Sequence, residues 1–174
     1  MQTLQGKNIQ LRALEPEDLQ FLFDTENDAS FWEVSHTQAP FSKFLLKQYL
    51  ENAQLDIYEA KQLRLIIQES KNNQTVGMID LFDFNPQHHR AGIGILIHQK
   101  YQQHGFASEA LALLINYCFT QLNLHQLYAN VTVDNSKSIG LFSKHNFKKI
   151  GVKKDWIYTE GNFKNEILLQ LINE

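Results

Sequence analysis

The chain has 174 residues, and its 16 basic and 19 acidic side chains leave a formal net charge of −3 at pH 7. This balance lacks the basic excess typical of nucleic-acid-binding proteins, no apolar run approaches the roughly 20 residues of a membrane span, and the N-terminus lacks a signal-peptide core. With 43% hydrophobic residues and a single cysteine, we expect one cytoplasmic domain over residues 1–174, without a nucleic-acid partner, membrane association or metal site.

The N-terminal third is predicted to contain a strand and two helices. Alternating apolar and polar residues predict a strand over 9–13. Pro16 near the start of an acidic turn, followed by apolar residues at helical spacing, predicts a helix over 15–27. The aromatic segment 28–41 is predicted to be a loop or a broken helix, and a serine-capped helix is expected over 42–54.

Strands dominate the rest of the chain. Apolar runs bounded by turn residues predict strands over 63–67, 76–84 and 91–98, and the strongest helical periodicity predicts a long helix over 106–122. The remaining predicted elements are a strand over 127–133, a helix over 136–145, and strands over 148–155 and 167–171. This order predicts a mixed sheet with helices packed on it.

The junction between the strand over 91–98 and the long helix has the features of an anion-binding site. The apolar strand leads into Gln102-Gln103-His104-Gly105-Phe106-Ala107, and the helix follows at once. The first N–H groups of a helix have no partners within the helix and carry the positive end of its dipole. Because Gly105 would let a phosphate approach closely, the junction predicts a cradle for a pyrophosphate. A plain strand-to-helix turn is the alternative.

A second informative segment lies at the next strand-to-helix junction. The strand over 127–133 is followed by Asn135, and a short helix starts immediately. Asn135 and Ser138 would ordinarily be read as residues that cap this helix.

Together, the two segments resemble the signatures of the GNAT acyl-CoA N-acyltransferases. Gln102-x-x-Gly105-x-Ala107 matches the family's Arg/Gln-x-x-Gly-x-Gly/Ala motif. Asn135-x-x-Ser138-x-x-x-Phe142-x-x-x-x-Phe147 is similar to its Asn-x-x-(Ala/Ser)-x-x-Leu-Tyr-x-x-x-Gly-Phe segment. The order of elements agrees with the family over residues 7–173. Within the family, the chain most resembles the bacterial spermidine N-acetyltransferases, and next the ribosomal-protein N-terminal acetyltransferases.

The resemblance implies an α+β fold with a mixed, mostly antiparallel sheet of about seven strands and about four helices, in which splayed strands form an acyl-CoA cleft. It implies transfer of an acetyl group from acetyl-CoA to a primary amine by direct attack, with a polyamine or other small amine favoured. A peptide N-terminus as acceptor and a non-catalytic acetyl-CoA-binding sensor are the alternatives. Self-association into a homo-oligomer stays open.

The resemblance also implies which residues bind acetyl-CoA. Backbone groups of the splayed strand would pair with the pantetheine arm, and an N–H near Ile97 would polarise the thioester carbonyl. Loop amides would bind the pyrophosphate, and residues of the second segment would approach from the opposite wall. The implied acetyl-CoA-binding residues are Ile95, Leu96, Ile97, Gln102, Gln103, His104, Gly105, Phe106, Ala107, Asn135, Ser138 and Phe142.

The chain departs from the family pattern at the usual acid and base. Phe142 replaces the tyrosine that protonates the leaving thiolate, and a phenylalanine cannot donate a proton. Gly92 stands at about the place of a glutamate that helps to deprotonate the amine. Asp80 and Glu33 are the candidate catalytic substitutes, and Trp32, Glu33 and Asp80 are predicted to line the acceptor site.

The acidic residues near the predicted acceptor site also differ from those of the family. Asp80 and Asp83 point to opposite faces of a strand, so only one of them can face the cleft. The resembling polyamine enzymes carry two glutamates before a proline that matches Pro40, where this chain has Gln38 and Ala39. A polycation needs several carboxylates to replace its solvation, so this loss weakens the polyamine interpretation without excluding it.

Overall fold

The computed structural model describes residues 2–174, whose strands form one open sheet in the order β1-β2-β3-β4-β5-β7-β6. Neighbouring strands are antiparallel except β4 and β5, which run parallel. The strands are β1 Ile9–Arg12, β2 Leu63–Glu69, β3 Thr75–Asn85, β4 Arg90–Ile97, β5 Gln126–Thr132, β6 Lys148–Thr159 and β7 Asn162–Ile172. The predicted mixed, mostly antiparallel sheet of about seven strands is therefore confirmed.

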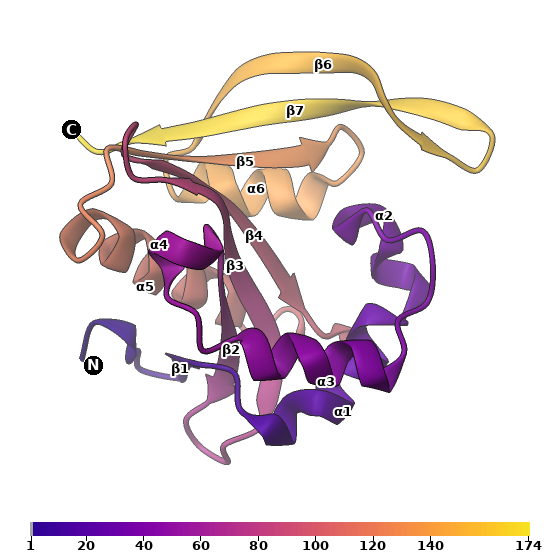
Figure 1. The fold of residues 1–174 in the computed structure, drawn as a ribbon. Helices are drawn as coiled ribbons and strands as arrows, with labels where there is room; N and C mark the ends of the chain where they lie inside the picture. Colours follow the sequence, from indigo (N-terminus) through magenta and orange to yellow (C-terminus); the bar gives the residue numbers. More distant parts are fainter. Residues whose placement is uncertain (1) are drawn as a thin grey trace.

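Six α-helices are described, two more than predicted. They are α1 Leu19–Glu26, α2 Trp32–Ser35, α3 Lys43–Asn52, α4 Ile57–Ala60, α5 Phe106–Thr120 and α6 Ser136–Lys144. The two additional helices, α2 and α4, have four residues each, too few to show helical periodicity in the sequence. In Figure 1, α1, α2 and α3 lie together at one side of the molecule, and α6 lies along β5. No helix among residues 2–174 is long and apolar enough to cross a membrane.

Two apolar clusters hold the helices on the sheet. The larger one packs α5 against the central strands, and Ala110, Leu111, Leu114 and Cys118 of α5 are fully or almost fully buried in it. Burial raises the pKa of the Cys118 thiol, as expected for a core residue. The smaller cluster packs α1 and α3 on the other face of the sheet. Its buried members are Leu22, Leu46, Ile66 and Met78.

The sheet divides in the middle, between β4 and β5. These strands pair only where Arg90–Gly92 faces Gln126–Tyr128. Beyond Gly92 the strands diverge, and the gap between them is visible in Figure 1. The predicted splay is therefore confirmed, and it leaves the second half of β4 without a partner on one edge.

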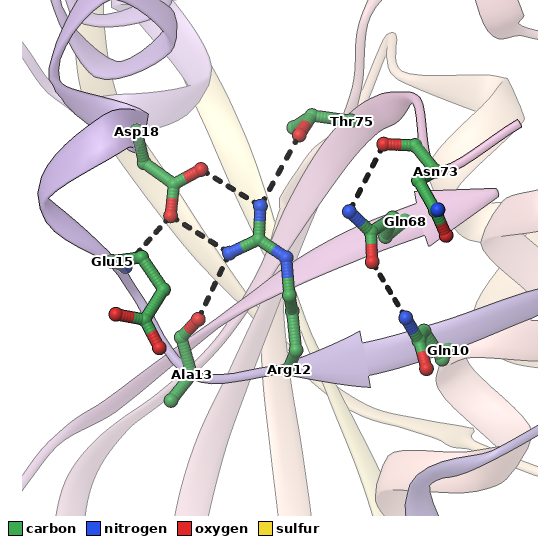
Figure 2. A network of polar contacts seen from close by, with 8 residues as sticks. All are labelled: Gln10, Arg12, Ala13, Glu15, Asp18, Gln68, Asn73 and Thr75. Carbon is green, nitrogen blue, oxygen red and sulfur yellow. Dashed lines mark hydrogen bonds and ion pairs between the residues drawn. The ribbon is translucent and has the colours of Figure 1, made fainter. Parts of the chain in front are cut away.

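An ion pair ties the start of the α1 region to the edge of the sheet (Figure 2). Arg12 of β1 holds Asp18 through two hydrogen bonds of 2.8 Å, and the Glu15 N–H donates to the same carboxylate. Burial by itself would raise the pKa of Asp18, but these hydrogen bonds hold it below its ordinary value. The bidentate pair fixes the start of α1, whose other end contributes Thr25 and Glu26 to the lining of a small cavity of about 100 Å³.

The β6–β7 hairpin is longer than the sequence predicted. Both residues of its turn, Glu160 and Gly161, have positive φ angles, of 48° and 81°. Such turns match the twist of the two strands and let pairing continue to the end of the hairpin. Trp156, Tyr158 and Phe163 are exposed there. The end of the hairpin is held by backbone pairing and is not buried in the core. Its sequence therefore lacks the alternation of apolar and polar residues that would have predicted these parts of the strands.

Candidate functional site

A cavity of about 350 Å³ lies against the second half of β4, between the starts of α5 and α6. We call it the donor cavity. It is lined by ten of the twelve predicted acetyl-CoA-binding residues: Ile95, Leu96, Ile97, Gln102, Gln103, Gly105, Phe106, Ala107, Asn135 and Ser138. Of the other two, His104 is exposed and stacks on Phe106, and Phe142 lines a neighbouring cavity. Sequence reasoning missed the lining residues Phe31, Val34, Tyr101, Ser108, Lys137 and Leu141.

The β4 wall of the donor cavity presents backbone groups that are not paired with a neighbouring strand. The His98 N–H donates to the Val76 carbonyl over 2.9 Å. Hydrogen-bonded positions recur at every second residue of an antiparallel pair, so Leu96 also bonds toward β3. Ile95 and Ile97 therefore direct their backbone groups toward the gap, where the Ile97 carbonyl accepts a hydrogen bond of 3.1 Å from Gln102 Nε2. This edge can pair with an extended, amide-containing chain such as a pantetheine arm.

The start of α5 forms a second wall. Gly105 precedes the helix with φ +78°, and a Cβ atom placed on it would meet no protein atom within 4 Å. The first intrahelical bond runs from the Glu109 N–H to the Gly105 carbonyl, so the N–H groups of Phe106, Ala107 and Ser108 have no partners within the helix. Open space, unpaired donors and the positive end of the α5 dipole suit a pyrophosphate.

The start of α6 forms the opposite wall. Asn135 Oδ1 accepts a hydrogen bond of 3.2 Å from the Ser138 N–H, which is the ordinary helix cap. Both residues also line the donor cavity, and Lys137 lies 3.5 Å from Gln102 Oε1 across it. The cap thus holds α6 against the cavity, so capping and cavity lining occur together.

A second cavity, of about 330 Å³, adjoins the donor cavity and shares four lining residues with it: Val34, Ile95, Asn135 and Ser138. We call it the acceptor cavity. Three carboxylates line it: Glu33 of α2, Asp80 of β3 and Glu166 of β7. Because the two cavities meet at Ile95, groups bound in each could come into contact there.

Asp80 lines the acceptor cavity, but it is held in an ion-pair network. Arg64 of β2 donates to both oxygens of Asp80, over 2.9 and 2.8 Å, and to Glu26 over 2.7 Å. Burial by itself would lower the pKa of Arg64, but Asp80 raises it above its ordinary value, so the guanidinium stays charged. Asp83 does not line the cavity and accepts a hydrogen bond from the Tyr128 hydroxyl. Only one of the two aspartates faces the cavity, as predicted.

The α2 segment contributes Glu33 but not Trp32. Glu33 lies 2.8 Å from Lys164 of β7, and Lys164 also lies 2.7 Å from Asp134. Hydrogen bonds to both carboxylates raise the pKa of Lys164. The Trp32 indole donates to the Glu26 carbonyl, and Trp32 lines neither the donor cavity nor the acceptor cavity. From this segment the acceptor cavity is lined by Val34 in place of the predicted Trp32, whereas Phe31 lines the donor cavity.

The structure gives a physical reason why position 92 holds a glycine and not the glutamate of the family pattern. A Cβ atom on Gly92 would overlap the ring of Phe82, so the ring fills the space that a side chain at this position would need. Phe142 is buried, packs edge-on against Phe147 at 5.0 Å, and lines the acceptor cavity. The positions of the family's usual acid and base are therefore both occupied by apolar groups.

Glu166 is the functional candidate that sequence reasoning missed. It is 3% exposed, lines the acceptor cavity, and lies 2.7 Å from Lys153 and 4.0 Å from His36. Lys153 and Glu166 face each other across β6 and β7, so their opposite charges were a signal. This pairing can be recognised only when the register of the β6–β7 hairpin is known, and the sequence did not predict that register. No group of three or more potential metal ligands occurs among residues 2–174.

Comparisons with known proteins agree with this geometry. A family model described as an acetyltransferase (GNAT) domain matches residues 8–148. The spermidine N(1)-acetyltransferase of Escherichia coli (strain K12) is 29% identical over 163 residues, which cover 92% of this chain and 83% of that protein. A crystal structure of Vibrio cholerae spermidine N-acetyltransferase with CoA and spermine superposes with a TM-score of 0.87, at 24% identity and 96% coverage of both chains. A dodecameric structure of the Vibrio cholerae enzyme gives a TM-score of 0.80, at 26% identity, with 96% of this chain and 95% of that chain covered.

Proposed function

Because the chain belongs to the GNAT acetyltransferase family and is an N-acetyltransferase with acetyl-CoA as its acyl donor, we propose that its acceptor is a primary amine of a polyamine. Membership of an enzyme family also sets aside the alternative of a non-catalytic sensor. The E. coli relative acts on spermidine, and the acceptor cavity of this chain has features that suit such a substrate.

The observation that carries this proposal is the charge around the acceptor cavity. Three groups of ion pairs there contain five carboxylates and three basic side chains in total, which leaves two net negative charges when histidine is neutral. The carboxylates are those of Glu26, Glu33, Asp80, Asp134 and Glu166, and the basic residues are Arg64, Lys153 and Lys164. A site with this excess attracts a molecule with two or more ammonium groups and replaces part of its solvation.

In this proposal, the chain acts mainly by positioning. The backbone of Ile95, the Ile97 N–H and the N–H groups at the start of α5 bind acetyl-CoA, whose thioester supplies an activated acetyl group. The acceptor amine enters from the acceptor cavity, so that it meets the thioester near Ile95. In this proposal Asp80 and Glu33 attract the acceptor as an ammonium ion, and Glu33 takes a proton from it before the free amine attacks the thioester carbonyl and the CoA thiolate leaves.

A thiol-release assay with acetyl-CoA tests the proposed acceptor. Spermidine and spermine should give higher kcat/KM values than butylamine. Only the polyamines carry more than one ammonium group, and so only they can match the two net negative charges around the acceptor cavity. A peptide with a free N-terminal alanine should be a poor acceptor. If the peptide is acetylated efficiently and the polyamines are not, the chain is a protein N-terminal acetyltransferase and the proposal fails.

We expect a Phe142→Tyr variant to turn over faster than the wild type. Phe142 lines the acceptor cavity, and a hydroxyl at this position could protonate the departing thiolate. A thiol with a pKa near 8.5 leaves slowly but measurably without help. A positioned acid contributes up to about 10²–10⁴-fold, and a gain of several-fold is expected here because other steps become limiting.

Steady-state kinetics with spermidine measure this effect. Phe147→Tyr is the matched control, because Phe147 is equally buried, contacts Phe142 and lines neither cavity. A gain in both variants, or in neither, would contradict a role for an acid at position 142.

We also propose that the chain self-associates through its sheet edge. Strand β6 ends the sheet, none of its residues is buried, and its exposed apolar side chains include Ile150, Val152, Trp156 and Tyr158. Unpaired strand edges with apolar side chains tend to be covered by another chain. The Vibrio cholerae structural neighbour is dodecameric. Light scattering should give a mass that is a multiple of 20.3 kDa, and a monomeric mass at micromolar concentration would contradict the proposal.

A further inference from the structure

Glu166 differs from the other two carboxylates of the acceptor cavity in its burial. Its side chain is 4% exposed, compared with 32% for Asp80 and 33% for Glu33. A carboxylate removed from water is costly unless both of its oxygens have partners. Both carboxylate oxygens of Glu166 are therefore expected to have partners.

Only one oxygen of Glu166 has a close partner. Oε1 lies 2.7 Å from Lys153 Nζ. Oε2 lies 4.0 Å from His36 Nε2, which is too far for a hydrogen bond, and none of the described side chains donates to it. His36 itself lines the acceptor cavity, so this oxygen lies toward a cavity wall. By contrast, both oxygens of Asp80 are bound by Arg64. Among these two carboxylates, Glu166 is the one with an oxygen left for a ligand.

The sheet places Asp80 and Glu166 on opposite sides of the gap. Asp80 faces Gly94 across β3 and β4, and Glu166 faces Thr132 across β5 and β7. Strands β4 and β5 have separated at this level, and the two cavities meet at Ile95 between them. An acceptor with amines at both ends can therefore bring one amine to Ile95 while its other end lies near Glu166.

We propose that Glu166 is a specificity-determining residue, whose carboxylate binds the ammonium group of the acceptor that does not react. This inference rests on the proposed function, because it concerns how a di- or polyamine is recognised. Glu166 supplies a carboxylate to an acceptor site that has Gln38 and Ala39 in place of the acidic pair expected before Pro40. A monoamine has no second ammonium group, so it gains nothing from Glu166.

Lys153 would compete with the ammonium group of the acceptor for the Glu166 carboxylate. Its Nζ also lies 3.1 Å from Asn130 Oδ1 and 4.8 Å from the centre of the Trp156 ring. These contacts keep the lysine beside Glu166 when no acceptor is bound. If an ammonium group competes with Lys153 for the carboxylate, removing the lysine must strengthen acceptor binding. A purely structural ion pair would show the opposite behaviour.

The first experiment compares spermidine with butylamine in wild-type and Glu166→Gln enzymes. We expect KM for spermidine to rise about tenfold or more with kcat little changed, and kcat/KM for butylamine to stay the same. Asp83→Asn is the matched control, because it removes a β3 carboxylate that does not line the acceptor cavity and that binds the Tyr128 hydroxyl. Equal losses for both amines, or no loss for spermidine, would overturn the proposal.

The second experiment uses Lys153→Met, whose side chain keeps much of the lysine stem. We expect KM for spermidine to fall several-fold in this variant, and an unchanged or raised KM would overturn the proposal. Acetyl-CoA affinity, measured by calorimetry, should be the same in all variants, which shows that each has folded with its donor cavity intact.

Calorimetric titration of spermidine into the CoA-saturated protein separates this proposal from the proposed function. If the wild type acetylates no polyamine, the proposed function fails. The Glu166 proposal then stands only if the wild type still binds spermidine more tightly than Glu166→Gln does. Equal affinities, or no binding by either protein, would overturn it.

Discussion

A Gly105→Val variant is expected to bind acetyl-CoA at least about tenfold more weakly, which corresponds to about 1.4 kcal/mol of binding free energy. Gly105 has φ +78°, and the space that its Cβ would enter contains no protein atom within 4 Å. The valine side chain would therefore occupy the open space at the unpaired N–H groups of α5. A left-handed backbone also costs a non-glycine residue about 1–2 kcal/mol, which favours movement of these groups.

A Gly161→Val variant shows whether the loss of affinity comes from the side chain in the donor cavity or from backbone strain. Gly161 has φ +81°, and a Cβ there also meets no atom within 4 Å, but it lies in the β6–β7 turn and lines neither cavity. Its substitution adds the same backbone strain without a side chain in the donor cavity. Calorimetry should show a loss of affinity only for Gly105→Val, with similar thermal unfolding of both variants. Retained affinity in a folded Gly105→Val protein would refute the pyrophosphate cradle.

An Arg64→Met variant is expected to lose about 3 kcal/mol of unfolding free energy, at the lower end of what breaking a buried ion pair costs. The Arg64 side chain is 23% exposed and pairs with both Asp80 and Glu26, so its removal leaves two mostly buried carboxylates that repel each other. For a domain of this size, Tm should fall by roughly 6–12 °C. Urea unfolding monitored by circular dichroism measures the free-energy change.

A triple variant identifies the cause of this loss. When Arg64→Met is combined with Glu26→Gln and Asp80→Asn, no unpaired charge remains, and more than half of the lost stability should return. If the triple variant is as unstable as the single one, the stability came from the packing of the Arg64 guanidinium, whose centre lies 5.7 Å from that of the Tyr49 ring. The network would then matter for acceptor binding but not for folding.

Local sequence signals predicted the donor side of the site well. The motif around Gly105 and the capping pair Asn135 and Ser138 each combine a helix start with the wall of the donor cavity. Their function depends on backbone N–H groups within a few residues, and such features are encoded by glycine, by caps and by helical periodicity. The predicted helix cap at Ser42 is likewise confirmed by its hydrogen bond from the Leu45 N–H.

The acceptor side could not be predicted in the same way. Asp80 was placed on the correct face of β3, but its pairing with Arg64 depends on the register of two strands. Trp32 and Phe31 are neighbours in sequence, and only the folded segment shows that Phe31 lines a cavity while the Trp32 indole bonds to α1. In such a short irregular segment, no periodicity indicates which side chain points inward.

The sequence by itself determined the order of the strands and of the longer helices, because hydrophobic periodicity and helix starts are local properties, and its resemblance to the GNAT motifs implied the class of donor that the chain binds. The tertiary structure alone decided the charge and shape of the acceptor cavity. There, Glu33, Asp80 and Glu166 come from elements far apart in the chain, and each is balanced by a base from yet another element. Whether a carboxylate is solvated, paired or free to bind an amine depends on burial and on strand register, and both arise only when the sheet is assembled.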